Sequence, residues 1–118
     1  MVDCIASHNQ KRAMDLYYDL LALKEEPMRI LFLITRQFQT LLTVKVMTPQ
    51  GFSNKDIAAK AGCPEWVVRK YQGQAKAFSL DRIKQAISDG VEYEEAVKTG
   101  HMNDQMAVEL FIVQYSKG

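Results

Sequence analysis

The sequence has few cysteines and almost no net charge, and both scarcities narrow the classes of protein it can belong to. Cys4 and Cys63 are its only cysteines, too few for a disulfide framework. Its 15 basic and 14 acidic side chains give a formal net charge of +1, so no overall field attracts it to nucleic acid or to anionic lipid. Its first residues do not follow the basic-then-apolar order of a signal peptide. We therefore expect a cytoplasmic protein.

The patterns of a membrane span and of a β-sheet are also lacking. The most apolar stretch, residues 28–47, is interrupted by arginine, lysine and glutamine, which favours a buried helix over a membrane span. No Asn-Gly hairpin turn occurs, and the one Asp-Gly pair, at Asp89 and Gly90, lies between helical patterns. Apolar residues recur instead at helical spacing, which predicts an all-α bundle in one domain over residues 1–118.

About six helices are expected from these patterns. Asparagine or serine suited to an N-cap precedes four of them, and proline opens two others. The helices are expected from Asn9 to about Leu23, from Pro27 to about Val46, from Ser53 and from Pro64 within residues 53–77, from Ser79 to Lys98, and from Asn103 to about Tyr115. Gly90 should weaken or bend the fifth of these by up to about 1 kcal/mol relative to alanine.

Two of these helices are apolar on more than one side. Residues 30–34 are apolar all round, which predicts a central helix surrounded by neighbours. The last helix has two apolar faces. It is either central in a monomer or shares one face with a partner chain, and the pattern leaves both possibilities open. One of these faces carries Met106, Ala107, Leu110 and Phe111, and the other carries Val108, Ile112 and Tyr115.

Catalytic, cofactor and metal sites are not indicated. His8 and His101 are isolated, and the Cys4-x₃-His8 spacing by itself is weak as a zinc signal. No GxxxxGK[ST] phosphate-binding loop is present. We therefore expect no metal, no cofactor and no enzymatic activity for this chain.

The stretch SNKDIAAKAGCPEWVVRK, residues 53–70, has the outline of a DNA-binding helix-turn-helix. Two helices that cross steeply need a small residue at their contact, a turn between them and an apolar side chain that fills the angle. Here these are Ala58, Gly62 and Val68. These are packing demands, and the exposed start of the second helix holds Pro64, Glu65 and Trp66, a poor set for contacting bases. An alternative hypothesis is a DNA-binding regulator that uses residues 53–77, with an excess of three positive charges there. Its phosphate contacts would be Trp66, Arg69, Lys70 and Lys76.

Three stretches in order along nearly the whole chain resemble one family. EEPMRILFLITRQFQTLLTVKVM, GFSNKDIAAKAGCPEWVVRKYQGQAKAFS and AVKTG are similar to the C-terminal domain of the delta subunit of bacterial DNA polymerase III. Glu94 stands where that family commonly has aspartate, and Gly90 is a less expected departure. The matching positions are Arg36, Gln37, Phe38, Leu41, Leu42, Lys45, Ile57, Ala58, Gly62, Val68, Gln74, Ala75, Phe78, Ser79, Lys98, Thr99 and Gly100.

The resemblance implies a non-catalytic collar domain of a replication clamp loader. In that family the helical C-terminal domains pack side by side and hold the DNA polymerase III clamp loader together. The resemblance also implies that this chain is a fragment without the two N-terminal AAA+-like domains, with Met1 in or just before a helix. The partners would be the other clamp-loader subunits. The sliding clamp would be contacted only by the missing N-terminal region, and DNA at most weakly by this one.

The interface of such a collar is expected on two helices. The candidates are the amphipathic half of the second helix and the two-faced last helix, whose second apolar face fits a domain that buries one side against neighbours. The partner-contact candidates are Arg36, Gln39, Thr43, Met106, Val108, Ile112 and Tyr115.

Overall fold

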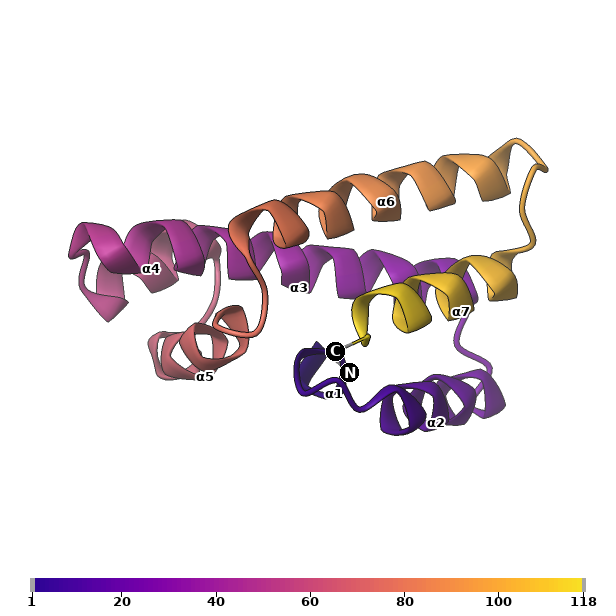
Figure 1. Cartoon of the computed structure of the whole chain (residues 1–118), viewed down its shortest axis with the longest axis horizontal. Coiled ribbons are helices and arrows are strands. Elements are labelled where there is room, and N and C mark those ends of the chain that lie inside the picture. The colour runs from indigo at the N-terminus through magenta and orange to yellow at the C-terminus, as the bar shows by residue number, and fades with distance from the viewer. Residues whose placement is uncertain (1, 118) are drawn as a thin grey trace.

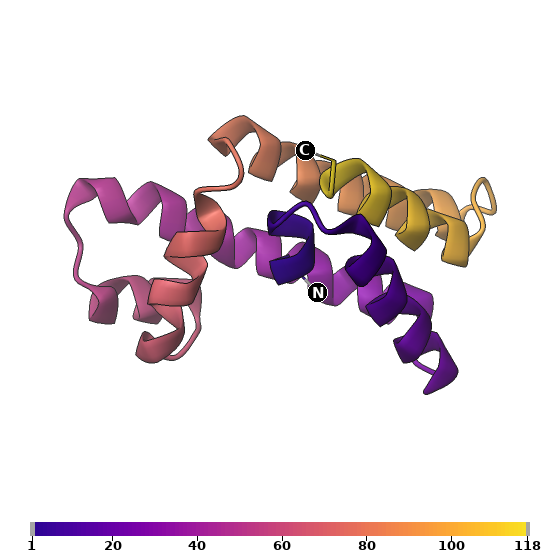
Figure 2. The same ribbon diagram turned by 60° about the horizontal axis from the view of Figure 1, so that its bottom comes forward.

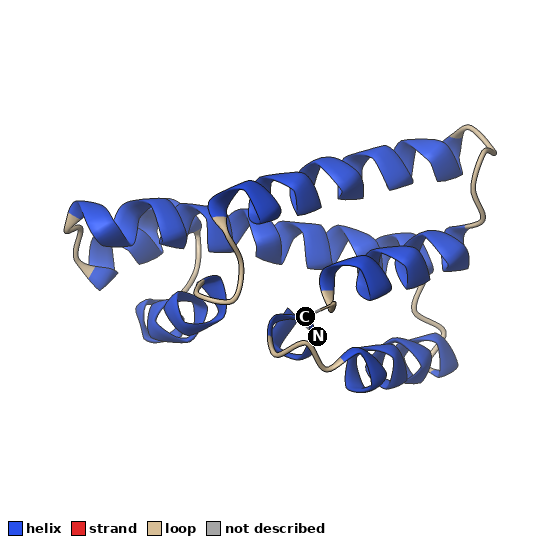
Figure 3. Ribbon diagram, viewed as in Figure 1, coloured by secondary structure: helices blue, strands red, loops and turns tan. Residues whose placement is uncertain are grey.

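The computed structural model describes residues 2–117, and within them the chain forms seven α-helices, one 3₁₀ turn and no strand (Figure 3). The predicted all-α bundle is therefore confirmed. The first helix was not predicted, because five residues are too few for a helical period to appear; the expectation for Met1 lies outside the described residues. The elements are α1 (Val2–Ala6), α2 (Gln10–Ala22), α3 (Pro27–Met47), η1 (Thr48–Gln50), α4 (Asn54–Ala61), α5 (Glu65–Ala75), α6 (Leu80–Lys98) and α7 (Asp104–Tyr115).

All four predicted N-caps are confirmed. In each, a side-chain oxygen accepts a hydrogen bond from a backbone N–H in the first turn, which satisfies a donor that the helix itself leaves free. The four bonds run from Arg12 N to Asn9 at 3.1 Å, from Asp56 N to Ser53 at 3.2 Å, from Arg82 N to Ser79 at 3.1 Å and from Met106 N to Asn103 at 3.1 Å.

Helix α3 is the element on which most of the others pack. Its 21 residues span about 32 Å, and it contacts α4, α5, α6 and α7. Figures 1 and 2 show α6 lying along α3, with α4 and α5 at one end of the molecule and α1, α2 and α7 towards the other. Among residues 2–117, one stretch, Pro27–Gln50, is long and apolar enough to span a membrane, with a mean hydropathy of 1.3. In this fold, however, it is the helix around which the bundle is assembled.

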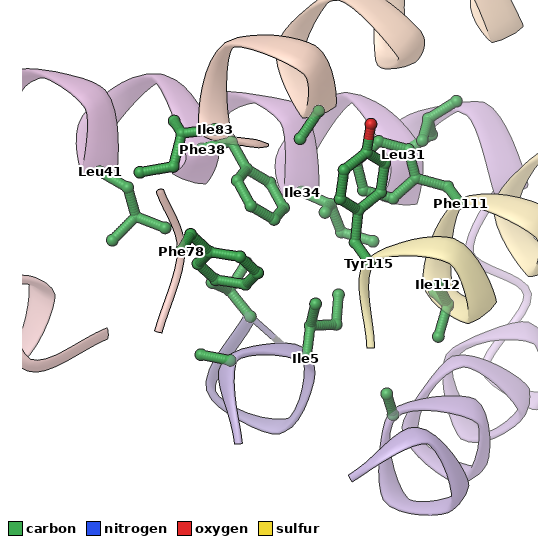
Figure 4. Close-up of a cluster of buried hydrophobic side chains, with 14 of the residues drawn as sticks. Ile5, Leu31, Ile34, Phe38, Leu41, Phe78, Ile83, Phe111, Ile112 and Tyr115 are labelled. Atoms are coloured by element: carbon green, nitrogen blue, oxygen red, sulfur yellow. The ribbon is translucent and has the colours of Figure 1, made fainter. Parts of the chain in front are cut away.

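The main core is an aromatic-rich cluster between α3, α6, α7 and the first two helices (Figure 4). Phe38 lies at its centre, and the centroid of its ring is 5.3 Å from that of Phe78, 5.8 Å from Phe111 and 5.9 Å from Tyr115. The buried members are Val2, Ile5, Ala6, Ala13, Tyr17, Ile30, Leu31, Ile34, Phe38, Leu41, Ala75, Phe78, Ile83, Ala86, Val108, Phe111, Ile112 and Tyr115.

A separate small core holds α4 and α5 against the end of α3. Its buried members are Val44, Ile57, Ala58 and Val68. Gly62 ends α4 in the left-handed conformation, with φ of 74°, and its N–H donates to the carbonyl of Ala58. The packing roles predicted for Ala58, Gly62 and Val68 are therefore confirmed.

Gly90 does not interrupt α6, although the sequence favoured a weakened or bent helix there. The helix runs unbroken from Leu80 to Lys98, and Gly90 is buried where α6 crosses α3. A Cβ on Gly90 would overlap Oγ1 of Thr35 and lie 3.0 Å from its Cγ2. The glycine is therefore needed for the close approach of the two longest helices.

The prediction that residues 30–34 are surrounded by neighbours is wrong on one side of α3. Ile30, Leu31 and Ile34 are buried, but Phe32 is 54% exposed and Leu33 is 44% exposed. The other helices of the chain cover only the side of α3 that carries the buried residues. Two large apolar side chains of the central helix are thus left facing solvent.

Candidate functional site

The most distinctive surface lies where α3 and α6 run side by side. Two large apolar side chains, Phe32 and Val91, are 54% and 58% exposed there. They border a shallow hollow whose floor includes Thr35 and Gly90, the pair at the close crossing of the helices. We call this surface the α3–α6 face and define it by Phe32, Arg36, Gln39, Thr43 and Val91.

Three of the predicted contact residues belong to this face. Arg36 and Gln39 line the hollow between α3 and α6, and together with Thr43 they also line a second hollow that reaches Ala61 of α4. Arg36 and Gln39 are exposed and Thr43 is half-buried. The fold thus gathers three polar side chains, Arg36, Gln39 and Thr43, beside the large aromatic side chain of Phe32.

One positively charged side chain on this face, Arg36, is unpaired within the described residues and so is free to pair with a partner. Within residues 2–117, Arg36 makes no ion pair, whereas Glu94 at the edge of the hollow is paired with Lys98 at 2.9 Å. An arginine beside exposed apolar groups is a combination enriched at protein–protein interfaces.

The predicted contacts on α7 divide into two groups. Val108, Ile112 and Tyr115 are 0%, 0% and 1% exposed and belong to the main core, so their side chains are covered by this chain itself and we withdraw them as partner contacts. Met106 is 52% exposed, and so is available. The helix has two apolar sides, as expected, but sequence pattern alone does not distinguish the side that the bundle covers.

A partly buried polar network fixes α7 to α6. The hydroxyl of Tyr115 donates to the carboxylate of Asp89, which also accepts from Nε2 of Gln114 at 3.2 Å. Tyr93 donates to Oε1 of Gln114 at 2.9 Å, and the guanidinium carbon of Arg82 lies 4.3 Å from the centre of the Tyr115 ring. Burial and the Asp89 acceptor together raise the pKa of Tyr115. The network orients α7 relative to α6.

The helix-turn-helix outline is present in the fold, but its four DNA-contact candidates are not equivalent. Trp66, 81% exposed, and Arg69 line one shallow hollow with Asn54 and the acidic Glu65. Lys70 forms an ion pair with Asp3 of α1 at 3.1 Å. The remaining candidate, Lys76, follows the end of α5 and lines a different hollow.

Metal-binding groups are dispersed. Among residues 2–117, no three histidine, cysteine, aspartate or glutamate side chains lie close enough to hold a metal ion together.

Several exposed apolar residues were missed as site candidates from sequence. They are Phe32, Leu33, Val91 and Leu110, which are 54%, 44%, 58% and 44% exposed. A signal for the first two was present, because a helix apolar on every side needs a neighbour on every side. Val91 gave none, since it continues the same apolar stripe as the buried Ile83.

Comparison with known proteins places this arrangement in one family. Residues 1–115 match a family model described as the DNA polymerase III delta subunit, C-terminal domain. DNA polymerase III subunit delta of Bacillus subtilis (strain 168) is 30% identical over 117 residues, which are 99% of this chain and 34% of the relative. The solved structure of the Bacillus subtilis DNA clamp loader delta protein superposes with a TM-score of 0.89 at 30% identity. That match covers 98% of this chain and 34% of the other.

The chain thus spans about a third of the length of the relatives it matches. Neither relative is named as a helix-turn-helix regulator, so the alternative hypothesis has no support from these comparisons. The family match extends over all seven helices, including the α4–α5 pair. The chain belongs to the family formed by the C-terminal domains of DNA polymerase III delta subunits.

Proposed function

We propose that this chain is the non-catalytic subunit-assembly domain of a clamp-loader delta subunit, acting in the cytoplasm during DNA replication. Family membership and the clamp-loader name of a relative support this proposal. The domain acts through binding energy alone: its apolar surface associates with neighbouring subunits and thereby sets the relative positions of the regions attached to it. Contact with the sliding clamp is assigned to the part of the relatives that lies outside this chain.

The observation that carries the proposal is the α3–α6 face. Phe32 and Val91 are more than half exposed on two helices that are otherwise the framework of the fold. Exposed apolar groups gathered in one place on a soluble domain mark interaction sites. Full burial of an exposed side chain of this kind contributes about 1.5–3 kcal/mol, and Phe32 and Val91, which are little more than half exposed, contribute about half of that each. Phe32 and Val91 are therefore expected to be among the strongest contacts of the assembly.

The surrounding polar groups are expected to determine which partner fits. Arg36 is exposed and forms no ion pair within residues 2–117, and Gln39 lies beside it. A partner that places a carboxylate opposite this guanidinium gains a charge-assisted hydrogen bond, and one that places a cation there is rejected. A second, smaller contact is assigned to Met106 and Leu110, 52% and 44% exposed on α7.

Assembly of the complete loader tests this function. A full-length delta subunit with the double substitution Phe32→Ser and Val91→Ser is mixed with the other purified subunits, and assembly is measured by sedimentation velocity. We expect the double variant to assemble about tenfold to a hundredfold more weakly than the unaltered subunit. Trp66→Ser is the matched control, because Trp66 is also an exposed large side chain but lies on α5.

Circular dichroism establishes that each variant keeps its helices before assembly is compared. The proposal is contradicted if the double variant assembles as tightly as the unaltered subunit, or if Trp66→Ser weakens assembly and the double variant does not.

A further inference from the structure

A further hollow, separate from those at the α3–α6 face and lined in part by Lys76, lies where the ends of α3 and α5 meet. It has a volume of about 160 Å³. Its floor includes Val44 and Ala75, which are 0% and 4% exposed. The lining residues are Val44, Lys45, Thr48, Pro49, Gln72, Ala75 and Lys76.

The size of this hollow suits a single large side chain. An apolar cavity of about 150 Å³ in another protein binds one benzene molecule. The hollow is open to solvent, so a phenylalanine or leucine side chain that entered it would be buried on the side that faces its floor. Such burial is favourable because it removes apolar surface of both partners from water.

Its walls are held in place by hydrogen bonds that do not depend on a ligand. Nε2 of Gln72 donates to Oγ1 of Thr48 and to Oδ1 of Asn54, both at 3.2 Å. The hydroxyl of Thr48 in turn donates to the carbonyl of Val44 at 2.7 Å. These bonds join α3, η1, α4 and α5 around the hollow, so a ligand would meet a formed site and little ordering cost.

The rim of the hollow is positively charged. Nζ of Lys45 donates to the carbonyl of Ala75 at 2.9 Å, which fixes one ammonium group beside the opening. Lys76 follows directly, is exposed, and forms no ion pair within residues 2–117. The lining contains no acidic residue. A ligand with carboxylates next to its apolar group therefore matches the site in charge as well as in shape.

We infer that this hollow, with Lys45 and Lys76 at its rim, binds an acidic peptide segment of a partner protein that inserts one large apolar side chain. The site does not rest on the assembly function, because its residues lie outside the α3–α6 face. The carboxylates of the segment contact the two ammonium groups while its aromatic or aliphatic side chain occupies the floor. Nucleic acid fits less well, because the surface inside the hollow is apolar and offers phosphate no partner beyond the rim.

A labelled peptide tests this inference directly. The probe is a fluorescein-labelled pentapeptide of sequence GDDEF with a free carboxyl terminus, titrated with the 118-residue chain and followed by fluorescence anisotropy. We expect saturable binding that weakens about tenfold or more for GDDEA, which lacks the apolar side chain. In ¹⁵N-labelled protein, the amide signals that move should be those of residues 44–48 and 72–76.

Two charge variants serve as a matched pair. Lys76→Glu reverses a charge at the rim, whereas Lys60→Glu reverses an exposed charge on α4 that does not line the hollow. We expect the first to weaken GDDEF binding several-fold at low salt and the second to change it little. We expect both variants to keep their helices, because both side chains are exposed, and circular dichroism checks this.

Three results would overturn the inference. One is the lack of saturable binding by GDDEF. Another is equal binding of GDDEF and GDDEA, which would reduce the site to a charged surface. The third is displacement of GDDEF by a single-stranded oligonucleotide that itself binds more tightly, with the same amide signals moving, which would assign the rim to nucleic acid.

Discussion

The α4–α5 pair and the body of the domain share helix α3 but bury very different sets of side chains. The small core under α4 and α5 consists of four aliphatic side chains, whereas the main core is centred on the ring of Phe38 and is rich in aromatic groups. The two helices of the pair have 8 and 11 residues, too few to be stable alone in water.

This difference explains why the outline of a DNA-binding motif is misleading here. Ala58, Gly62 and Val68 satisfy the needs of a helix pair that must dock tightly because it has little core of its own. The same residues would be required whether or not the pair contacted DNA. The motif therefore reflects the packing of the helix pair and does not indicate DNA binding. The functional assignment rests on other surfaces.

The largest difference between the two regions is expected when a large side chain in each core is replaced by alanine. Phe38→Ala removes the centre of the main core and is expected to cost about 3–5 kcal/mol of unfolding free energy, with all helices lost together. Ile57→Ala, at a fully buried site of the small core, should cost about 2–5 kcal/mol but release mainly α4 and α5. Urea denaturation gives the free energies, and hydrogen exchange shows which helices open.

Equal exposure of every helix in the Ile57→Ala variant would show instead that the two cores form one cooperative unit. In that case the distinction between the regions would concern composition only.

Alkaline pH should destabilise the main core through Tyr17. Burial, with a smaller contribution from Glu109, raises the pKa of Tyr17 from its ordinary value of 10.0 to about 12. The folded state therefore holds the phenolic proton more tightly than the unfolded state, so stability is full below pH 10 and is lost as the pH rises towards 12. Without a phenol to ionise, the Tyr17→Phe variant should lose about 2–3 kcal/mol less of its unfolding free energy over this pH range.

The comparison residue is Tyr71, which packs against both cores and whose pKa is raised mainly by burial. Tyr71→Phe should flatten the alkaline limb of the stability curve less than Tyr17→Phe does. A curve left unchanged by Tyr17→Phe would contradict the assigned shift.

Two glycines in helices offer a matched test of packing against helix propensity. Gly90→Ala should destabilise by about 1–3 kcal/mol, because the new Cβ overlaps Thr35 where α6 crosses α3. Gly73→Ala in α5 meets no atom within 4 Å and should stabilise by about 0.5–1 kcal/mol. Thermal unfolding of both variants shows whether packing or helix propensity determines the effect at each position.

A second substitution locates the cause. Thr35→Ala combined with Gly90→Ala should recover part of the loss, since it removes Oγ1 and Cγ2 of Thr35, the two atoms nearest to the new Cβ. Additive effects of the two substitutions would place the strain elsewhere.

The smallest effect is expected at the contact between α1 and α5. Lys70 and Asp3 are paired at 3.1 Å, but their side chains are 59% and 54% exposed. Lys70→Met should therefore cost less than about 1 kcal/mol. Lys98→Met, at the exposed pair on α6, should also change the stability little. A much larger loss for Lys70→Met, measured by urea denaturation, would mean that this pair holds the two regions together.

Local features were predictable from the sequence, and the outward faces of helices were not. The N-caps at Asn9, Ser53, Ser79 and Asn103 act within one helical turn, so a few neighbouring residues determine them. The five residues of α1 fold because they pack on the main core, which no local pattern records.

Leu31 and Phe32 illustrate the limit within a single helix. Both are large and apolar and they are adjacent in sequence, yet one is 2% exposed and the other 54% exposed. Only the placement of the other helices decides between them. The same holds for α7, where Tyr115 is buried in the main core and Met106 faces solvent.

Site-specific photocrosslinking tests the assembly function most directly. Benzoylphenylalanine is placed at position Val91 of the full-length delta subunit, and at Gln85 as a control that is exposed on the same helix but outside the α3–α6 face. After irradiation of the assembled loader, crosslinks to a neighbouring subunit are expected from position 91 and not from position 85. Crosslinks from position 85 alone, or from neither position, would contradict the assignment of this face to subunit assembly.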